Sequence, residues 1–327
     1  MKNRILITGV GSAIGYGHVK SLRDTKKYFL VGADCNAESI GFLWCDEKYL
    51  LPKVSDTNYF TVLEKICATE KIDFILIGST VELPFFAVKK SEIEKKLNVQ
   101  IICNTAETIS NANDKFETQI FLQKNNFNFI RSEINFENTS LEKYLSGVSF
   151  PLFAKPRFGK GSAGIRKINS RSEIVKEELN DFVLQEFIPD DDGEFTVGIL
   201  IGRNKEILSC IILKRELKFG MTFRAERMEN ELIKNYCLAV AQALPSFGPL
   251  NFQLRIKNGQ PYIFEINPRF SSSSFMRTIL GVNEPHIFLH YLNTGEILPQ
   301  TISEYKIVVR GFDDFVLTDE HLKFKTP

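Results

Sequence analysis

Apolar and polar residues alternate in two neighbouring runs of this chain, 251–256 and 262–265. The short segment Lys257-Asn258-Gly259-Gln260 separates them. Alternation with a period of two is typical of a strand with one buried face, and an Asn-Gly pair favours the tight turn of a hairpin. The pattern therefore predicts a β-hairpin in this region.

Short apolar runs at 4–8, 29–33 and 73–78 alternate with helix-like segments near the start of the chain. Strands that alternate with helices predict an α/β unit with a parallel sheet. Further short strands follow at 150–154 and 182–188. We therefore expect an α/β unit followed by an α+β part that contains the hairpin.

The composition argues against several classes of protein. The 327 residues suggest two or three domains, and 41 Lys and Arg against 40 Asp and Glu give no electrostatic signal for nucleic acid or anionic membranes. Six scattered cysteines without a Cys-x-x-Cys motif argue against zinc and against a disulfide scaffold. With no membrane-length apolar segment and no signal peptide, we expect a soluble cytoplasmic protein.

The second strand of the predicted hairpin ends in a group of oxygen donors. Glu265 and Asn267 are two residues apart and therefore point to the same side of the strand, and Gln253 is expected to lie across from them. Such ligands suit Mg²⁺, which proteins commonly hold together with nucleotide phosphates. Arg269 adds positive charge. The alternative is an ordinary strand end that runs into a Pro-containing turn.

A lysine and a glycine-rich loop form a second candidate site. Lys155 ends an apolar strand, and Gly159, Lys160, Gly161 and Ser162 follow it. Glycines let backbone N–H groups approach phosphate oxygens, and the lysine supplies a compact charge. The alternative is a glycine-rich hairpin turn with a solvated lysine. A P-loop is excluded, because Gly-Lys-Ser/Thr does not open a helix here.

The order of these motifs is more specific than any one of them. Lys155 and the glycine loop are followed by Gln185-Glu186-Phe187-Ile188, Gly193-Glu194-Phe195-Thr196, Asn251-Phe252-Gln253 and Glu265-Ile266-Asn267-Pro268-Arg269. This series, over about residues 105 to 295, resembles the ATP-grasp superfamily and most of all its carbamoyl-phosphate-synthase-like carboxylate–amine ligases.

The resemblance implies a role for each matching position. The cofactors would be ATP and one or two Mg²⁺ ions, with Mn²⁺ as an alternative metal. Lys115 follows Asn113 and Asp114, either of which is a plausible helix cap, so a solvated helix lysine is the alternative there. The implied roles are phosphate binding by Lys155, Lys115 and the glycine loop, adenine binding by Glu186, Phe187 and Ile188, ribose binding by Glu194, metal binding by Gln253, Glu265 and Asn267, and stabilisation of phosphoryl and acyl-phosphate charge by Arg269.

The N-terminal segment has the spacing Gly9-x-Gly11-x-x-x-Gly15, which departs from the dinucleotide-binding fingerprint. The resemblance implies instead a Rossmann-like domain that helps to form the acceptor site. Ser79 and Thr80 follow an apolar strand and are either acceptor contacts or helix caps. The substrate candidates are Gly11, Ser12, Glu82, Arg215, Ser271 and Ser272.

The leading hypothesis is an ADP-forming carboxylate–amine ligase that acts on small molecules through an acyl-phosphate. An ATP-grasp kinase, a non-catalytic nucleotide-binding regulator and a nicotinamide oxidoreductase are the alternatives. A homodimer is left open, and no nucleic-acid or membrane partner is expected. The predicted divisions are a Rossmann-like domain at 1–104, a first ATP-grasp lobe with the lid at 105–187, a metal-binding lobe at 188–300 and a tail at 301–327.

Overall fold

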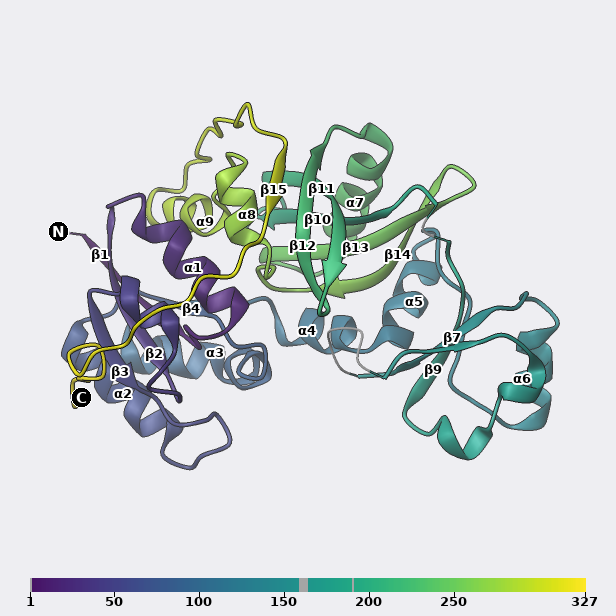
Figure 1. Ribbon diagram of the computed structural model, residues 1–327, viewed down its shortest axis with the longest axis horizontal. Coiled ribbons are helices and arrows are strands. Elements are labelled where there is room, and N and C mark those ends of the chain that lie inside the picture. The colour runs from purple at the N-terminus through teal and green to yellow at the C-terminus, as the bar shows by residue number, and fades with distance from the viewer. Residues whose placement is uncertain (1, 159–163, 190) are drawn as a thin grey trace.

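The computed structural model describes residues 2–158, 164–189 and 191–327. Its strands form three sheets, of five, four and six strands. Figure 1 shows the five-stranded sheet in the lobe that holds both termini, the six-stranded sheet in the middle, and the four-stranded sheet in the lobe farthest from the termini.

The first sheet is entirely parallel and has the strand order β3-β2-β1-β4-β5. Helices connect most of its strands, as the alternation of apolar runs predicts. The carboxyl ends of β1 and β4 lie side by side, with Thr8 opposite Ile77. The elements are β1 (Asn3–Thr8), α1 (Ala13–Arg23), β2 (Tyr28–Asp34), η1 (Ile40–Trp44), β3 (Glu47–Leu50), α2 (Tyr59–Glu70), β4 (Phe74–Ile77), α3 (Leu83–Leu97) and β5 (Gln100–Ile102).

The smallest sheet is antiparallel and has the order β6-β9-β7-β8. A separate cluster of buried apolar side chains, which includes Leu141, Leu152 and Leu184, packs against this sheet. This lobe therefore has a core of its own. Its elements are β6 (Ser132–Glu133), α6 (Asn138–Leu145), β7 (Leu152–Pro156), β8 (Arg166–Ile168), η2 (Arg171–Glu173), η3 (Lys176–Glu178) and β9 (Phe182–Glu186).

The six-stranded sheet is antiparallel and has the order β14-β13-β10-β11-β12-β15. Its β13–β14 hairpin confirms the prediction, and Asn258 and Gly259 take φ values of 53° and 71°, as a two-residue hairpin turn requires. The strands are β10 (Glu194–Ile201), β11 (Ile207–Lys218), β12 (Met221–Met228), β13 (Gly248–Lys257), β14 (Gln260–Asn267) and β15 (Ile307–Val309).

Within the described ranges, five helices flank the six-stranded sheet. The apolar side chains of α7 share a core with one face, and α4 and α5 pack beside β14. Those of α8 and α9 share a core with the other face. In the part of the chain that the structure describes, no helix has both the length and the apolar character needed to cross a bilayer. The helices are α4 (Ala106–Asn113), α5 (Lys115–Lys124), α7 (Glu231–Ala243), α8 (Ser274–Ile279) and α9 (Glu284–Thr294).

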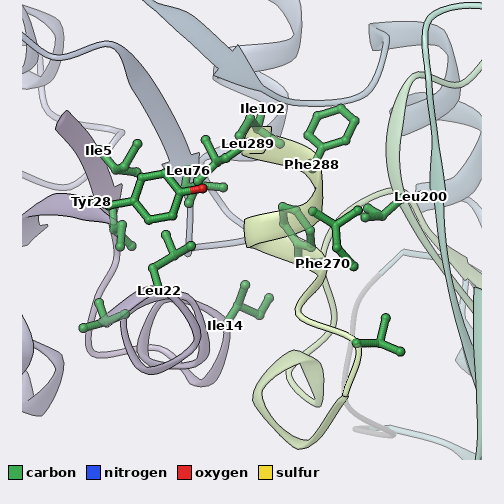
Figure 2. Close-up of a cluster of buried hydrophobic side chains, with 14 of the residues drawn as sticks. Ile5, Ile14, Leu22, Tyr28, Leu76, Ile102, Leu200, Phe270, Phe288 and Leu289 are labelled. Carbon is green, nitrogen blue, oxygen red and sulfur yellow. The ribbon is translucent and has the colours of Figure 1, made fainter. Parts of the chain in front are cut away.

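One apolar core joins the parallel sheet to the six-stranded sheet. Figure 2 shows Leu22 and Tyr28 of the N-terminal unit facing Phe288 and Leu289 of α9, with Leu200 of β10 on the far side. All of these side chains are buried. Burial of shared apolar surface fixes how the two units sit relative to each other. The carboxyl ends of the parallel strands are therefore held in a set position beside β14.

A buried ion pair lies on the face of the six-stranded sheet that α8 and α9 cover. Arg277 Nη1 donates to both carboxylate oxygens of Glu284, at 2.9 and 3.1 Å. Its Nη2 donates to Thr196 Oγ1 at 3.2 Å and to Asn251 Oδ1 at 2.5 Å. A Cβ on Gly198 would lie 2.0 Å from Arg277 Nη1, so only glycine leaves room for this pair.

Gly198→Ala is therefore expected to lower the free energy of unfolding by at least about 2 kcal/mol, because the added methyl group must displace a buried, hydrogen-bonded charge. Urea unfolding measures this change. Gly311→Ala is the matched control, since a Cβ there meets nothing within 4 Å, and a change within about 0.5 kcal/mol is expected. Equal unfolding midpoints for the two variants would contradict the argument.

Candidate active site

Strand β14 ends at a pocket that is lined by three parts of the chain. Glu265, Asn267 and Arg269 come from β14 and the residues after it, Lys115 from the first turn of α5, and Thr80 from the loop after β4. Ligands of parallel sheets bind at the carboxyl ends of strands, and Thr80 occupies that position. The pocket therefore lies where the parallel sheet, α5 and β14 meet.

The three predicted metal ligands lie close together on β13 and β14. Gln253 is directly opposite Glu265 across the hairpin. Asn267 Nδ2 donates to Glu265 Oε1 at 2.9 Å, and Arg269 Nη2 donates to Asn267 Oδ1 at 2.9 Å. Gln253 Oε1 accepts from Arg215 Nη2 at 2.8 Å. Arg269, Asn267 and Glu265 therefore form one hydrogen-bonded chain, and Gln253 lies opposite Glu265 with Arg215 as its own partner.

The donor set fits a hard divalent cation, because Gln253, Glu265 and Asn267 all carry oxygen donors. It includes one carboxylate, and the described residues contain no cluster of three His, Cys, Asp or Glu side chains that could hold a metal. A Mg²⁺ ion held here would therefore need further oxygen ligands, which nucleotide phosphates and water supply.

Arg269 keeps its charge beside these oxygen donors. Burial lowers the pKa of its guanidinium to about 10, and the Glu265 carboxylate opposes that decrease. A group with this pKa is almost fully protonated at neutral pH. Its Nη1 also donates to the carbonyl of Phe270 at 2.8 Å, so the side chain is held in one position.

Lys155 projects from β7 between two aromatic rings. Its Nζ lies 5.7 Å from the ring centroid of Phe153 and 5.5 Å from that of Phe264. Burial lowers the pKa of this ammonium to about 8, and the nearby Glu265 carboxylate opposes the decrease. The structure thus places the predicted phosphate lysine within electrostatic range of the predicted metal strand.

Lys115 lies at the start of α5 and turns toward β7. Of the two candidate caps, Asp114 is the one that forms, since its Oδ1 accepts from the N–H groups of Phe116 and Glu117. Lys115 Nζ donates to the carbonyl of Pro156 at 3.1 Å, and burial lowers its pKa while Glu265 opposes the decrease. The helix cap and an inward-facing lysine therefore occur together, so the solvated helix lysine is not what the structure shows.

The predicted hinge and ribose residues are held by a group of ion pairs. Glu186 accepts from Lys257 Nζ at 2.5 Å. Glu194 receives Arg215 on one carboxylate oxygen at 2.6 Å and Arg255 on the other at 2.8 Å. Each arginine donates through two nitrogens, a geometry that fixes the carboxylate firmly.

The hinge also carries an aromatic contact and a second link to β13. The ring of Phe187 lies 5.2 Å from that of Phe153, edge to face. The carbonyl of Ile188 accepts from Arg255 Nη1 at 2.9 Å. Arg255 belongs to none of the sequence motifs, although its place two residues from Gln253 on the same strand face could have indicated it.

Two predicted acceptor contacts, Gly11 and Ser12, have partners inside the N-terminal unit. Ser12 caps α1 by accepting from the N–H of Gly15, and it donates to the carbonyl of Gly78. The N–H of Gly11 donates to Asp34 at 2.8 Å. These two residues therefore support the turn after β1, and the pocket at the end of β14 does not include them.

Glu82 faces the interior and does not line this pocket. It is buried and accepts from Thr8 Oγ1 at 2.6 Å and Tyr59 Oη at 2.9 Å. Burial raises the pKa of its carboxyl group. Glu82 occupies the N-cap position of α3, so the predicted capping by Ser79 or Thr80 does not occur.

The serine run after Arg269 makes a tight turn. Ser271 is buried with its Oγ 2.9 Å from Ser273 Oγ, and the carbonyl of Ser272 accepts from Arg310 Nη2 at 2.7 Å. The predicted lid residues Gly159, Lys160, Gly161 and Ser162 lie outside the described residues.

Comparisons with known families agree with this geometry. A family model described as "ATP-grasp in the biosynthetic pathway with Ter operon" matches residues 178–312. A model described as "PylC-like, N-terminal domain" matches residues 5–102. The second match covers the parallel sheet, and the first covers the six-stranded sheet with the hairpin.

A curated relative is the carbamoyl phosphate synthase large chain of Sulfurisphaera tokodaii, 23% identical over 303 residues. The match covers 83% of this chain but 28% of the relative, so the chain spans under a third of that protein's length.

Solved structures with the same fold include the biotin carboxylase of Campylobacter jejuni, with a TM-score of 0.72 and 13% identity over 92% of this chain and 74% of that one. A second is the biotin carboxylase domain dimer of Hydrogenobacter thermophilus 2-oxoglutarate carboxylase with MgADP, with a TM-score of 0.70 and 14% identity over 94% of this chain and 71% of that one. The predicted combination of an α/β unit with an α+β part is confirmed.

Proposed function

We propose that this chain is an ATP-dependent, ADP-forming carboxylate–amine ligase acting on small molecules. The matches to a PylC-like N-terminal domain and, after it in the sequence, to an ATP-grasp domain support this proposal. The observation that carries this proposal is that Lys115, Lys155 and Arg269 gather around Glu265, whose carboxylate opposes the decrease in pKa of all three cations. Cations beside one carboxylate and two amide oxygens suit a magnesium nucleotide.

In the proposed reaction, a carboxylate oxygen of the first substrate attacks the γ-phosphorus of ATP and ADP leaves. An amine of the second substrate then attacks the carbonyl carbon of the acyl-phosphate. Inorganic phosphate leaves, the nitrogen loses a proton, and an amide or peptide-like bond results. The protein contributes positioning and charge stabilisation and takes no covalent part.

The described residues divide this work. Lys155 and Lys115 would hold the nucleotide phosphates, and Arg269 would stabilise the charge on the transferred phosphoryl group and on the acyl-phosphate. Glu186, Phe187 and Ile188 would bind adenine, and Glu194 the ribose. Gln253, Glu265 and Asn267 would hold Mg²⁺, which supplies neutralisation of phosphate charge when bound.

The likeness to solved ATP-grasp structures supports ATP and Mg²⁺ as cofactors. One or two ions, and Mn²⁺ in their place, fit the same ligands. A homodimer and a cytoplasmic location belong to the proposal as well. Thr80 lines the pocket and is the better candidate for an acceptor contact than Glu82.

A hydroxylamine capture experiment tests the acyl-phosphate. Pools of amino acids and sugar acids are incubated with ATP, Mg²⁺ and hydroxylamine, which replaces the amine and converts an acyl-phosphate into a hydroxamate. We expect hydroxamate and ADP in equal amounts. A phosphorylated product that hydroxylamine does not consume would show a kinase instead. NAD(H) binding by calorimetry would support an oxidoreductase.

A further inference from the structure

Strand β15 brings a cation to the loop that follows Arg269. Arg310 comes directly after β15, and its N–H donates to the carbonyl of Phe223 at 2.7 Å. The ring of Phe312 lies 6.0 Å from that of Phe223. The backbone around Arg310 is therefore fixed at the edge of the six-stranded sheet, where the tail leaves β15 and crosses toward α1 (Figure 1).

The guanidinium of Arg310 is half-buried among three elements. Its Nη2 donates to the carbonyl of Ser272 at 2.7 Å, and its Nη1 lies 3.6 Å from Met221 Sδ. Burial lowers its pKa, and Tyr16 of α1 opposes the decrease. The cation thus lies where the N-terminal unit, the serine turn and β12 come together.

Arg310 lacks the carboxylate partner that its neighbours have. Among the residues that the structure describes, it forms no ion pair, and Asp313 influences Tyr16 without coming within ion-pair distance of the Arg310 guanidinium. A partly desolvated cation is costly unless an anion pairs with it. Four other arginines of the same sheet each pair with a glutamate, namely Arg215, Arg224, Arg227 and Arg255.

The position of Arg310 relative to the candidate active site follows from chain length. Ser272 lies three residues after Arg269, and three residues span at most about 11 Å. The carbonyl of Ser272 holds the Arg310 guanidinium directly. The carbonyl that binds Arg310 therefore lies within about 11 Å of the backbone at Arg269, a separation that an extended small molecule with two charged groups can span.

We propose that Arg310 binds an oxyanion of the ligase's small-molecule substrate, a carboxylate or a phosphate that does not itself react. The planar guanidinium can bind such a group through two parallel hydrogen bonds. The tail strand thereby completes the substrate site and selects anionic substrates. That the ligand is a ligase substrate rests on the proposed function, whereas the anion site itself is tested by binding alone.

The test measures thermal unfolding of the full chain in titrations with glutarate and with inorganic phosphate. At least one of these anions is expected to raise the Tm of wild type, because a ligand that binds only the folded state stabilises it. In Arg310→Gln the apparent affinity is expected to fall at least about tenfold, the loss of one charge-assisted hydrogen bond or more. The glutarate and phosphate arms distinguish a carboxylate site from a phosphate site.

Arg171→Gln is the matched control, since Arg171 forms an exposed pair with Glu142 in the smallest sheet's lobe. Arg310→Lys keeps the charge without the fork, and an intermediate affinity is expected. If Arg310→Gln fails to fold, Arg310→Lys decides, and wild-type affinity there would overturn the proposal. Equal affinities of wild type and Arg310→Gln, or no Tm increase of wild type with either anion, would also overturn it.

The failure of this proposal differs from failure of the ligase proposal. If anion binding depends on Arg310 but the protein releases no ADP, the anion site is supported and the ligase proposal is refuted. If the protein releases ADP but its anion binding does not depend on Arg310, the anion site is refuted and the ligase proposal stands.

Discussion

Glu265→Ala is expected to reduce Mg²⁺-dependent ADP formation by at least about 100-fold, because it removes the single carboxylate among the proposed metal ligands. Burial lowers the pKa values of Lys155, Lys115 and Arg269, and the Glu265 carboxylate opposes that decrease. Its loss therefore weakens metal binding and disturbs three cations at once. Steady-state ADP release at several Mg²⁺ concentrations measures the effect.

The control is Glu231→Ala, which removes a carboxylate that is 71% exposed on α7. We expect it to retain wild-type turnover. Higher Mg²⁺ concentrations should not restore the activity of Glu265→Ala. The metal role of Glu265 would be refuted if this variant folds like wild type and still releases ADP at a comparable rate.

Lys155→Met is expected to weaken ATP binding by about 10- to 100-fold, the value of a charge-assisted contact with phosphate. The pKa of Lys155 near 8 adds a pH dependence. The lysine is cationic below that pKa and neutral above it, so kcat/KM for ATP should fall as pH rises through about 8. Calorimetry and pH–rate profiles measure the two effects.

Stability should change in the opposite direction from binding. The folded-state pKa of Lys155 is below its ordinary value of 10.5, so the charged lysine destabilises the folded protein below about pH 8. This cost disappears as pH rises from about 8 to above 10.5. Lys155→Met should therefore unfold no more easily than wild type at pH 7.

Two further variants separate these effects. Lys155→Arg should bind ATP less well but lose the decline above pH 8, because arginine stays charged. Lys143→Met removes an exposed lysine of α6 and should match wild type. ATP affinity that is the same in Lys155→Met and wild type would remove Lys155 from the phosphate site.

Local patterns were sufficient to predict the β13–β14 hairpin and the pairing of Gln253 with Glu265 across it. Alternation and an Asn-Gly turn determine the register, and the register places Gln253 opposite Glu265. A cap at Asn113 or Asp114 was predictable for the same reason, since capping depends on neighbours in sequence, and Asp114 takes that role. These features needed no information about distant parts of the chain.

Features that depend on distant contacts were not predictable from sequence alone. Glu82 follows a parallel strand, as an acceptor contact would, yet Thr8 and Tyr59 hold its carboxylate in the interior. The partners of Glu194 lie 21 and 61 residues away in sequence. No motif in the tail indicated a role for Arg310, which the pairing of β15 with β12 places beside Ser272.

The most direct measurement is ADP release from ATP by wild type in the presence of Mg²⁺ and pooled amino acids, sugar acids and simple amines. We predict ADP release that requires both Mg²⁺ and a particular pool, and that Glu265→Ala loses. ATP binding without ADP release in any pool would contradict the ligase and would favour a nucleotide-binding regulator.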